Sequence, residues 1–136
     1  MYNGGAIRVD DILPVGDITE YDVIRILPFG GKIVTVTMKG SLLEQTLAQG
    51  RASKGEGGFL QTGNVSGGGE GTPWLIGGKA LDPDAEYTVA VLDYLIKVGD
   101  DKLKFLVSNP DVPIIADNGD VRKALIAELK KRFPAR

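Results

Sequence analysis

The sequence predicts a single α+β domain in which helices pack against a mixed β-sheet. Its length of 136 residues suits one domain. Hydrophobic residues at 43% and charged residues at 25% are the proportions of a compact globular protein. Segments that alternate every second residue are interspersed with segments of helical spacing. We therefore expect residues 1–136 to form one domain.

The first expected helix covers residues 17–27 and precedes a strand. Asp17 or Thr19 can cap this helix, and Asp22, three residues after Thr19, completes a capping box. Pro28 ends the helix because its ring cannot continue the backbone hydrogen bonds. Residues 32–38 alternate and are rich in β-branched side chains, which predicts a strand. Its better-buried face carries Val34, Val36 and Met38.

A second helix is expected shortly after residue 40. Ser41 and Glu44 have the spacing of a capping box, and Leu43 and Leu47 form an apolar stripe. Gly50 can adopt the left-handed conformation with which many helices end. The sequence therefore predicts a helix from Ser41 to Gly50.

Many of the 19 glycines fall between residues 50 and 78, which predicts loops there. Within this region we interpret 59–61 and 74–76 as two short strands joined by a mobile hairpin at 66–71. After a turn at 81–84, a further strand is predicted by the alternation of Tyr87, Val89 and Val91.

The last expected helix begins at Asp120. Its apolar positions are Val121, Ala124, Leu125, Leu129 and Phe133. The basic residues of its last turn are favourable at the negative end of the helix dipole. We interpret them as a solvated helix end, so no nucleic-acid polymer is expected as a partner.

Composition excludes several classes of chemistry. The chain has no histidine and no cysteine, which rules out a Ser-His-Asp triad, a cysteine nucleophile and a thiolate or histidine metal site within it. Acidic and basic residues are interspersed, with a formal net charge of −2. No stretch reaches the 18 or so apolar residues that a membrane-spanning helix needs. We expect no catalytic residue, no metal ligand and no membrane segment in this chain.

The opening run Asn3-Gly4-Gly5-Ala6-Ile7-Arg8 is a candidate ligand site. Residues with little or no side chain let backbone amides approach a ligand, and the Arg8 guanidinium can bind phosphate oxygens or ribose hydroxyls. The alternative is a tight turn with a surface arginine.

Two aromatic residues and a carboxylate extend this candidate site. Phe29 lies in a Pro-Phe-Gly-Gly turn that could present its ring, and Tyr94 continues a strand pattern past its end and could supply a second ring. Asp100, beside a glycine, could accept hydrogen bonds from both ribose hydroxyls. For Phe29 the alternative is a ring that caps the core. Asp100 and Asp101 alone are too few ligands for a hard cation.

Together these segments resemble the C-terminal domain of the 5′-nucleotidase family, which includes UDP-sugar hydrolases and 2′,3′-cyclic phosphodiesterases. Asn3-Gly4-Gly5-Ala6-Ile7-Arg8 matches the family's Asn-Gly-Gly-Gly-Ile-Arg, and Leu27-Pro28-Phe29-Gly30 matches its Leu-Pro-Phe-Gly. Other matches, in the expected order, are Gly16-Asp17-Ile18-Thr19, Met38-Lys39-Gly40-Ser41-Leu42-Leu43, Gly58-Phe59-Leu60-Gln61 and Leu81-Asp82-Pro83-Asp84. The resemblance runs nearly end to end.

The resemblance implies a two-domain phosphoric ester hydrolase of periplasmic, secreted or cell-surface location. In it an N-terminal domain would hold two divalent metal ions and hydrolyse the substrate, whereas this domain would bind the nucleotide or nucleoside. We therefore expect the chain to be a fragment of a longer enzyme, without its catalytic metallophosphoesterase domain and inactive by itself. The alternative is a structural fragment that binds no ligand autonomously.

The resemblance also assigns roles to site residues. Phe29 and Tyr94 would sandwich the base, Asn3 and Arg8 would bind near the base, ribose and phosphate, and Asp100 would accept from the ribose hydroxyls. Tyr94 stands where the family usually has phenylalanine. Asp93 stands where asparagine is common, and Val98 departs from the family's Gly-Gly-Asp-Gly segment.

Overall fold

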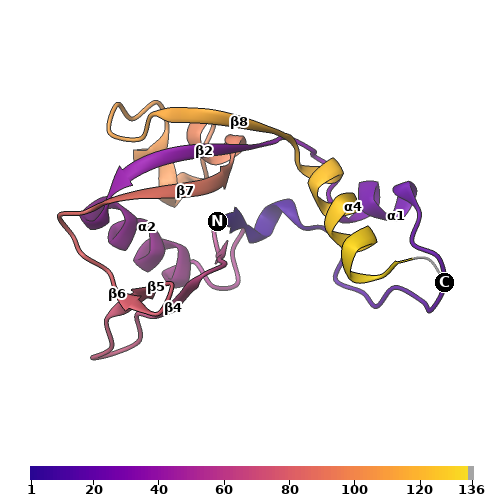
Figure 1. Cartoon of the computed structure of the whole chain (residues 1–136), viewed down its shortest axis with the longest axis horizontal. Helices are drawn as coiled ribbons and strands as arrows, with labels where there is room; N and C mark the ends of the chain where they lie inside the picture. The colour runs from indigo at the N-terminus through magenta and orange to yellow at the C-terminus, as the bar shows by residue number, and fades with distance from the viewer. Residues whose placement is uncertain (135–136) are drawn as a thin grey trace.

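The computed structural model describes residues 1–134, which are built around a three-stranded sheet. Its central strand is β2 (Lys32–Lys39), flanked by β7 (Glu86–Leu92) and β8 (Ile114–Asp120). The α+β class is confirmed (Figure 1). Strand pairs in the described residues are antiparallel, whereas the sequence predicted a mixed sheet.

The main core lies on one face of this sheet. On β2 the alternation predicted the buried residues correctly, because Val34, Val36 and Met38 are at most 3% exposed. They pack with Leu43 and Leu47 of α2 (Gly40–Ala52) and with buried leucines of the 3₁₀ helix η2 (Asp101–Leu106).

Two smaller sheets lie beside this core. β1 (Tyr2–Asn3) pairs with β3 (Leu60–Gln61), and a three-stranded sheet contains β4 (Val65–Gly67), β5 (Trp74–Ile76) and β6 (Lys79–Ala80). The predicted strands at 59–61 and 74–76 therefore exist. They do not pair with each other, because the residues after position 61 form a further strand that pairs with β5.

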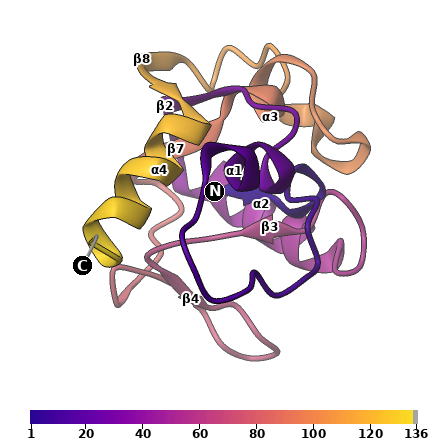
Figure 2. The same cartoon turned by 90° about the vertical axis from the view of Figure 1, so that its right-hand side faces the viewer.

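A second, smaller core lies at the other end of the molecule, next to α1 (Glu20–Ile26) and α4 (Val121–Arg132) (Figures 1 and 2). The Thr19–Asp22 capping box on α1 is confirmed, and the Asp120 side chain caps α4. The buried residues of this small core are Ala6, Leu27, Leu92 and Val121.

The start and end of α2 differ from the prediction. The helix begins at Gly40, so Ser41 is already inside it and makes no capping box with Glu44. The orphan amides of the first turn are bound instead by the chain near residue 84, since Gly40 N donates to Ala85 O and Ser41 N to Pro83 O. Gly50 is an interior position of α2, where a Cβ would lie 2.5 Å from Leu60 Cγ.

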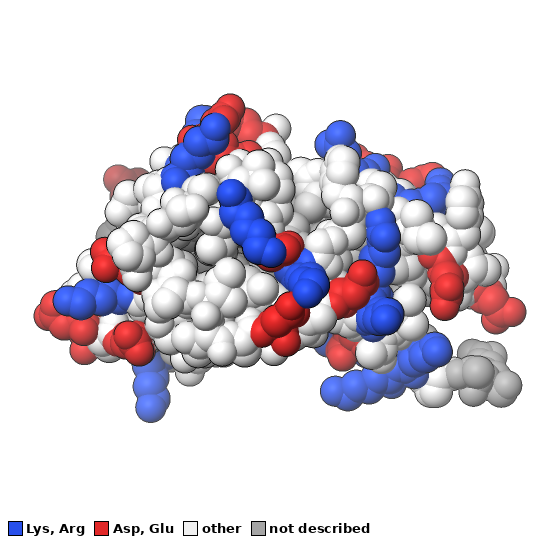
Figure 3. Space-filling model, turned by 90° about the horizontal axis from the view of Figure 1, so that it is seen from above, with Lys and Arg blue, Asp and Glu red and all other residues white. Residues whose placement is uncertain are grey.

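Charges of both signs alternate over the face seen in Figure 3, which agrees with the interspersed sequence. None of the helices within residues 1–134 has the length and apolar character to cross a membrane.

Candidate nucleotide-binding cleft

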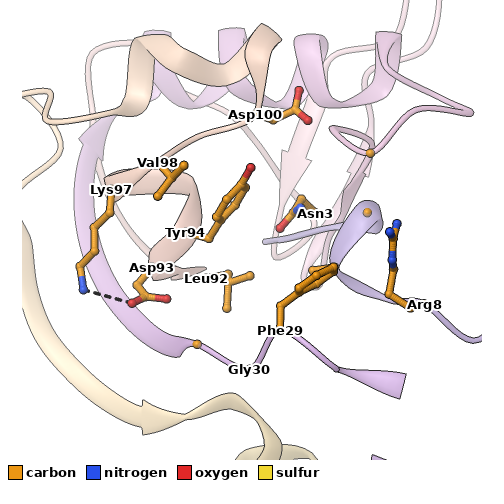
Figure 4. A pocket seen from close by; sticks show the side chains of 14 residues that line it. Asn3, Arg8, Phe29, Gly30, Leu92, Asp93, Tyr94, Lys97, Val98 and Asp100 are labelled. Atoms are coloured by element: carbon orange, nitrogen blue, oxygen red, sulfur yellow. Dashed lines mark hydrogen bonds and ion pairs between the residues drawn. The ribbon is translucent and has the colours of Figure 1, made fainter. Parts of the chain in front are cut away.

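A cleft of about 560 Å³ opens between the N-terminal segment, the turn that carries Phe29 and the helix α3 (Asp93–Lys97) (Figure 4). Its lining includes the site residues predicted from the sequence, Asn3, Arg8, Phe29, Tyr94 and Asp100, and comes from four separate stretches of the chain. The lining residues are Asn3, Gly5, Ala6, Arg8, Phe29, Gly30, Gly31, Gly57, Leu92, Asp93, Tyr94, Lys97, Val98 and Asp100.

Phe29 forms one side of the cleft. Its turn needs the two glycines that follow, because Gly30 and Gly31 have φ values of +63° and +100°, which L side chains rarely adopt. The ring is 67% exposed, and the guanidinium carbon of Arg8 lies 5.3 Å from its centroid. Phe29 is therefore presented to the solvent and does not cap the core.

Tyr94 forms the opposite side. It lies in the first turn of α3 and not in a continued strand, because the chain leaves β7 at Leu92 and turns into helix. Leu95 and Ile96, the next residues of α3, are buried in the main core, whereas Tyr94 is 40% exposed and faces the cleft (Figure 4).

Asn3 lies between these two rings in the view of Figure 4. Its side chain is 5% exposed, and its Oδ1 has no hydrogen-bond partner among residues 1–134. The backbone that carries it is fixed, since Gly4 N donates to Phe59 O at 2.6 Å and Gly5 N donates to Gly57 O at 2.9 Å. A buried, unsatisfied amide oxygen is costly in a folded protein, which marks this group as one that a ligand could satisfy.

Asp100 lies above the rings in the view of Figure 4 and caps the start of η2, where its Oδ1 accepts a hydrogen bond from Lys102 N at 3.3 Å. The chain at Gly57 and Gly58 passes close to the carboxylate, and a Cβ on Gly58 would lie 2.5 Å from Oδ1. The glycines of this loop thus leave room for the carboxylate at the edge of the cleft.

Asp93 and Lys97 form an ion pair on the Tyr94 side of the cleft. Asp93 Oδ2 lies 3.1 Å from Lys97 Nζ, and its Oδ1 accepts from Lys32 N at 3.0 Å. Burial raises the pKa of Asp93, but these hydrogen bonds more than offset it, so its pKa lies below the usual value. Sequence reasoning noted Asp93 only as a departure from a family pattern and missed Lys97. The signal available was their i,i+4 spacing, which is typical of a helical ion pair.

The cleft suits recognition of a flat ligand. Two opposed rings can stack on an aromatic group, while an amide, a guanidinium and a carboxylate can bind polar groups around it. Within the described part of the chain, no three acidic side chains gather in a way that could hold a metal ion.

Comparison with known proteins identifies the family. Residues 1–107 match the family model described as "5′-nucleotidase, C-terminal domain". The chain belongs to this family. The match covers all the cleft-lining segments and ends before β8 and α4.

The relatives of this 5′-nucleotidase C-terminal domain are longer proteins. It is 39% identical over 102 residues to Protein UshA of Yersinia enterocolitica and 32% identical over 102 residues to Silent protein UshA(0) of Salmonella typhimurium. Each alignment covers 72% of this chain and 18% of the relative. The chain thus spans about a fifth of the length of the curated relatives it matches.

Solved structures share the fold of the domain. A 5′-nucleotidase precursor from Thermus thermophilus aligns with a TM-score of 0.76 and 24% identity, over 96% of this chain and 28% of that one. The NAD nucleotidase NadN of Haemophilus influenzae aligns with a TM-score of 0.66 and 24% identity, over 96% of this chain and 26% of that one. The fold therefore extends beyond the segment that the family model matches.

Proposed function

We propose that this domain binds the nucleoside part of a nucleotide substrate. The observation that supports the proposal most is the pair of exposed rings, Phe29 and Tyr94, with the unpartnered amide of Asn3 between them (Figure 4). A base stacked between two rings gains about 1–3 kcal/mol per ring. Asn3 Oδ1 then accepts from a base N–H or a ribose hydroxyl.

The remaining polar groups bind the sugar and phosphate. Arg8 provides a planar donor group that suits phosphate oxygens and ribose hydroxyls. Asp100 accepts hydrogen bonds from the ribose hydroxyls, because an ionised carboxylate has lone pairs beyond the one used by Lys102 N. Family membership supports these roles, since nucleotidases are among the proteins with this fold.

The proposal extends to the protein that contains this domain. A separate N-terminal domain holds two divalent metal ions and hydrolyses the phosphoric ester, whereas the present chain supplies recognition. Two metal ions in that domain would supply the nucleophile and stabilise the leaving oxygen. Incubation of the isolated chain with AMP and Mg²⁺ or Mn²⁺ should release no phosphate above the protein-free rate, and metal-dependent release would contradict this division of labour.

Titration of AMP and adenosine, followed by amide NMR shifts, tests the binding role. We expect saturable shifts at residues of the cleft. Phe29→Ala should weaken binding by roughly 5- to 150-fold, the equivalent of about 1–3 kcal/mol. The matched control is Phe133→Ala, because Phe133 is 68% exposed and Phe29 67%, yet Phe133 lies outside the cleft.

Three outcomes would count against the binding role. The first is the absence of saturable shifts at roughly 10 mM ligand with the fold intact, which would favour a structural fragment without autonomous binding. The second is an equal loss of affinity in both phenylalanine variants. The third is a loss of stability of about 3–5 kcal/mol in Phe29→Ala, the usual cost of removing a core ring.

A further inference from the structure

Arg122, in the first turn of α4, contacts the turn that carries Phe29. Its Nε donates to Leu27 O at 2.8 Å, and its Nη2 donates to Pro28 O at 2.6 Å. These carbonyls belong to the two residues immediately before Phe29. The planar guanidinium offers several donors in fixed directions, so one side chain can hold two consecutive carbonyls.

Further contacts hold the same turn against α4. Val121 N donates to Gly31 O at 3.0 Å, on the other side of Phe29. A Cβ on Gly30 would lie 3.3 Å from the guanidinium carbon of Arg122, so the glycine allows the arginine to lie close to the backbone. The first turn of α4 is itself fixed, because Asp120 Oδ1 accepts from Arg122 N at 2.8 Å.

Apart from the Arg8 guanidinium, whose carbon lies 5.3 Å from its centroid, the Phe29 ring has little other support. With 67% of its surface exposed, Phe29 gains few packing contacts from the rest of the domain. Its direction therefore depends on the backbone of residues 27–31, and Arg122 and Val121 hold this backbone from both sides.

We propose that Arg122 is a positioning residue that orders the Phe29 turn for base stacking. The proposal rests on the nucleotide-binding function above. Arg122 does not line the cleft, and it lies beyond the segment that the family model matches. The C-terminal helix, none of whose residues lines the cleft, thereby sets the geometry of one of its walls.

The first arm of the test needs no ligand. Hydrogen exchange and NMR relaxation of Gly30 and Gly31 are compared in the full chain, in Arg122→Ala and in Lys123→Ala, whose exposed side chain is the control on the same helix. Arg122→Ala should speed exchange and increase motion at both glycines, whereas Lys123→Ala should not. Unchanged glycines in folded Arg122→Ala would overturn the proposal.

Arg122→Lys is a second, milder variant, which keeps the test possible if Arg122→Ala does not fold. Lysine keeps the charge and most of the apolar stem but has no planar fork to hold two carbonyls. We expect the motion of Gly30 and Gly31 in this variant to lie between those of the parent chain and Arg122→Ala. If Gly30 and Gly31 were as rigid as in the parent chain, a positive charge alone would order the turn. That result would contradict the proposal that Arg122 orders it by binding two carbonyls at once.

The second arm measures AMP affinity in a double-mutant cycle. Arg122→Ala should weaken binding by about tenfold, part of the contribution of one stacked ring. In a Phe29→Ala background the same change should have no further effect, because the arginine acts through the ring. Additive losses would refute the positioning role. If the parent chain does not bind AMP, the nucleotide site itself fails, and the ligand-free arm still decides whether Arg122 orders the turn.

Discussion

The two sides of the cleft, which carry Phe29 and Tyr94, present similar aromatic rings but are held in place by different interactions. Tyr94 stands on α3, whose neighbouring residues Leu95 and Ile96 belong to the main core. Phe29 stands on a turn supported by the small core and by hydrogen bonds to α4. One wall is therefore set by burial in the main core, and the other by a smaller core together with polar contacts to a helix distant in sequence.

This difference predicts unequal local stability. Regions with few buried apolar contacts open more readily than the core. We therefore expect amides of the Phe29 turn to exchange faster than those of α3 and η2.

The largest expected effect is on stability, when a buried leucine that supports either wall is shortened to alanine. Leu95→Ala should lower the free energy of unfolding by about 2–5 kcal/mol, because Leu95 is fully buried in the main core. Leu27→Ala, in the small core, should cost less, since its surroundings can relax toward solvent. Urea unfolding of both variants measures the difference. A larger loss of unfolding free energy in Leu27→Ala would mean that the Phe29 side, and not the Tyr94 side, is the more stable one.

Gly58→Ala should affect binding more than stability. Its new Cβ would lie 2.5 Å from Asp100 Oδ1, so the carboxylate must move from its place at the cleft edge. Hydrogen bonds to a charged group contribute about 1.5–3 kcal/mol, so AMP affinity should fall by roughly 10- to 150-fold. Gly63→Ala is the matched control, because nothing lies within 4 Å of its new Cβ and Gly63 lies outside the cleft. Equal AMP affinities in the two variants would show that Asp100 does not contribute to binding.

Asp93 should make the Tyr94 wall sensitive to acid. Its pKa in the folded domain is below the usual value of about 3.9, although burial alone would raise it. A carboxyl of this kind stabilises the fold above its unfolded pKa, and the contribution is lost as pH falls through the lower folded value. Unfolding free energies measured from neutral pH to about pH 2.5 should therefore decline more in the parent chain than in Asp93→Asn. Parallel curves would show that the ion pair contributes nothing.

Tyr94→Phe should change the protein least. Stacking depends on the ring face, which tyrosine and phenylalanine share, so AMP affinity should change by less than about threefold, or roughly 0.6 kcal/mol. Calorimetric or NMR titration of the two proteins checks this. A larger loss would mean that the hydroxyl, and not the ring face, contacts the ligand.

Local signals predicted much of the fold. The Thr19–Asp22 capping box, the alternation of Val34, Val36 and Met38, and the Asp120 cap are each determined by neighbouring residues, and all are confirmed. The start of α2 was wrong because backbone carbonyls from residues 83 and 85 bind its first amides. β8 was not predicted, since it is largely exposed and carries little alternation.

The candidate site could be predicted in part, because some of its residues also stand in recognisable local patterns. Glycine and aromatic positions indicated the cleft-lining residues, whose ligand-binding roles remain predictions. Arg122 could not be found from sequence, because its partners Leu27 and Pro28 lie 95 and 94 positions away. Tyr94 was expected on an extended strand, whereas the burial of Leu95 and Ile96 favours a helix at this point.

The proposed stacking is tested most directly by the contact between the nucleobase and the two rings. Intermolecular NOEs can be measured between the base protons of AMP and the ring protons of Phe29 and Tyr94 at saturating ligand. A base held between the rings should give NOEs to both of them. NOEs to neither ring, or to residues outside the cleft, would contradict base stacking in this cleft.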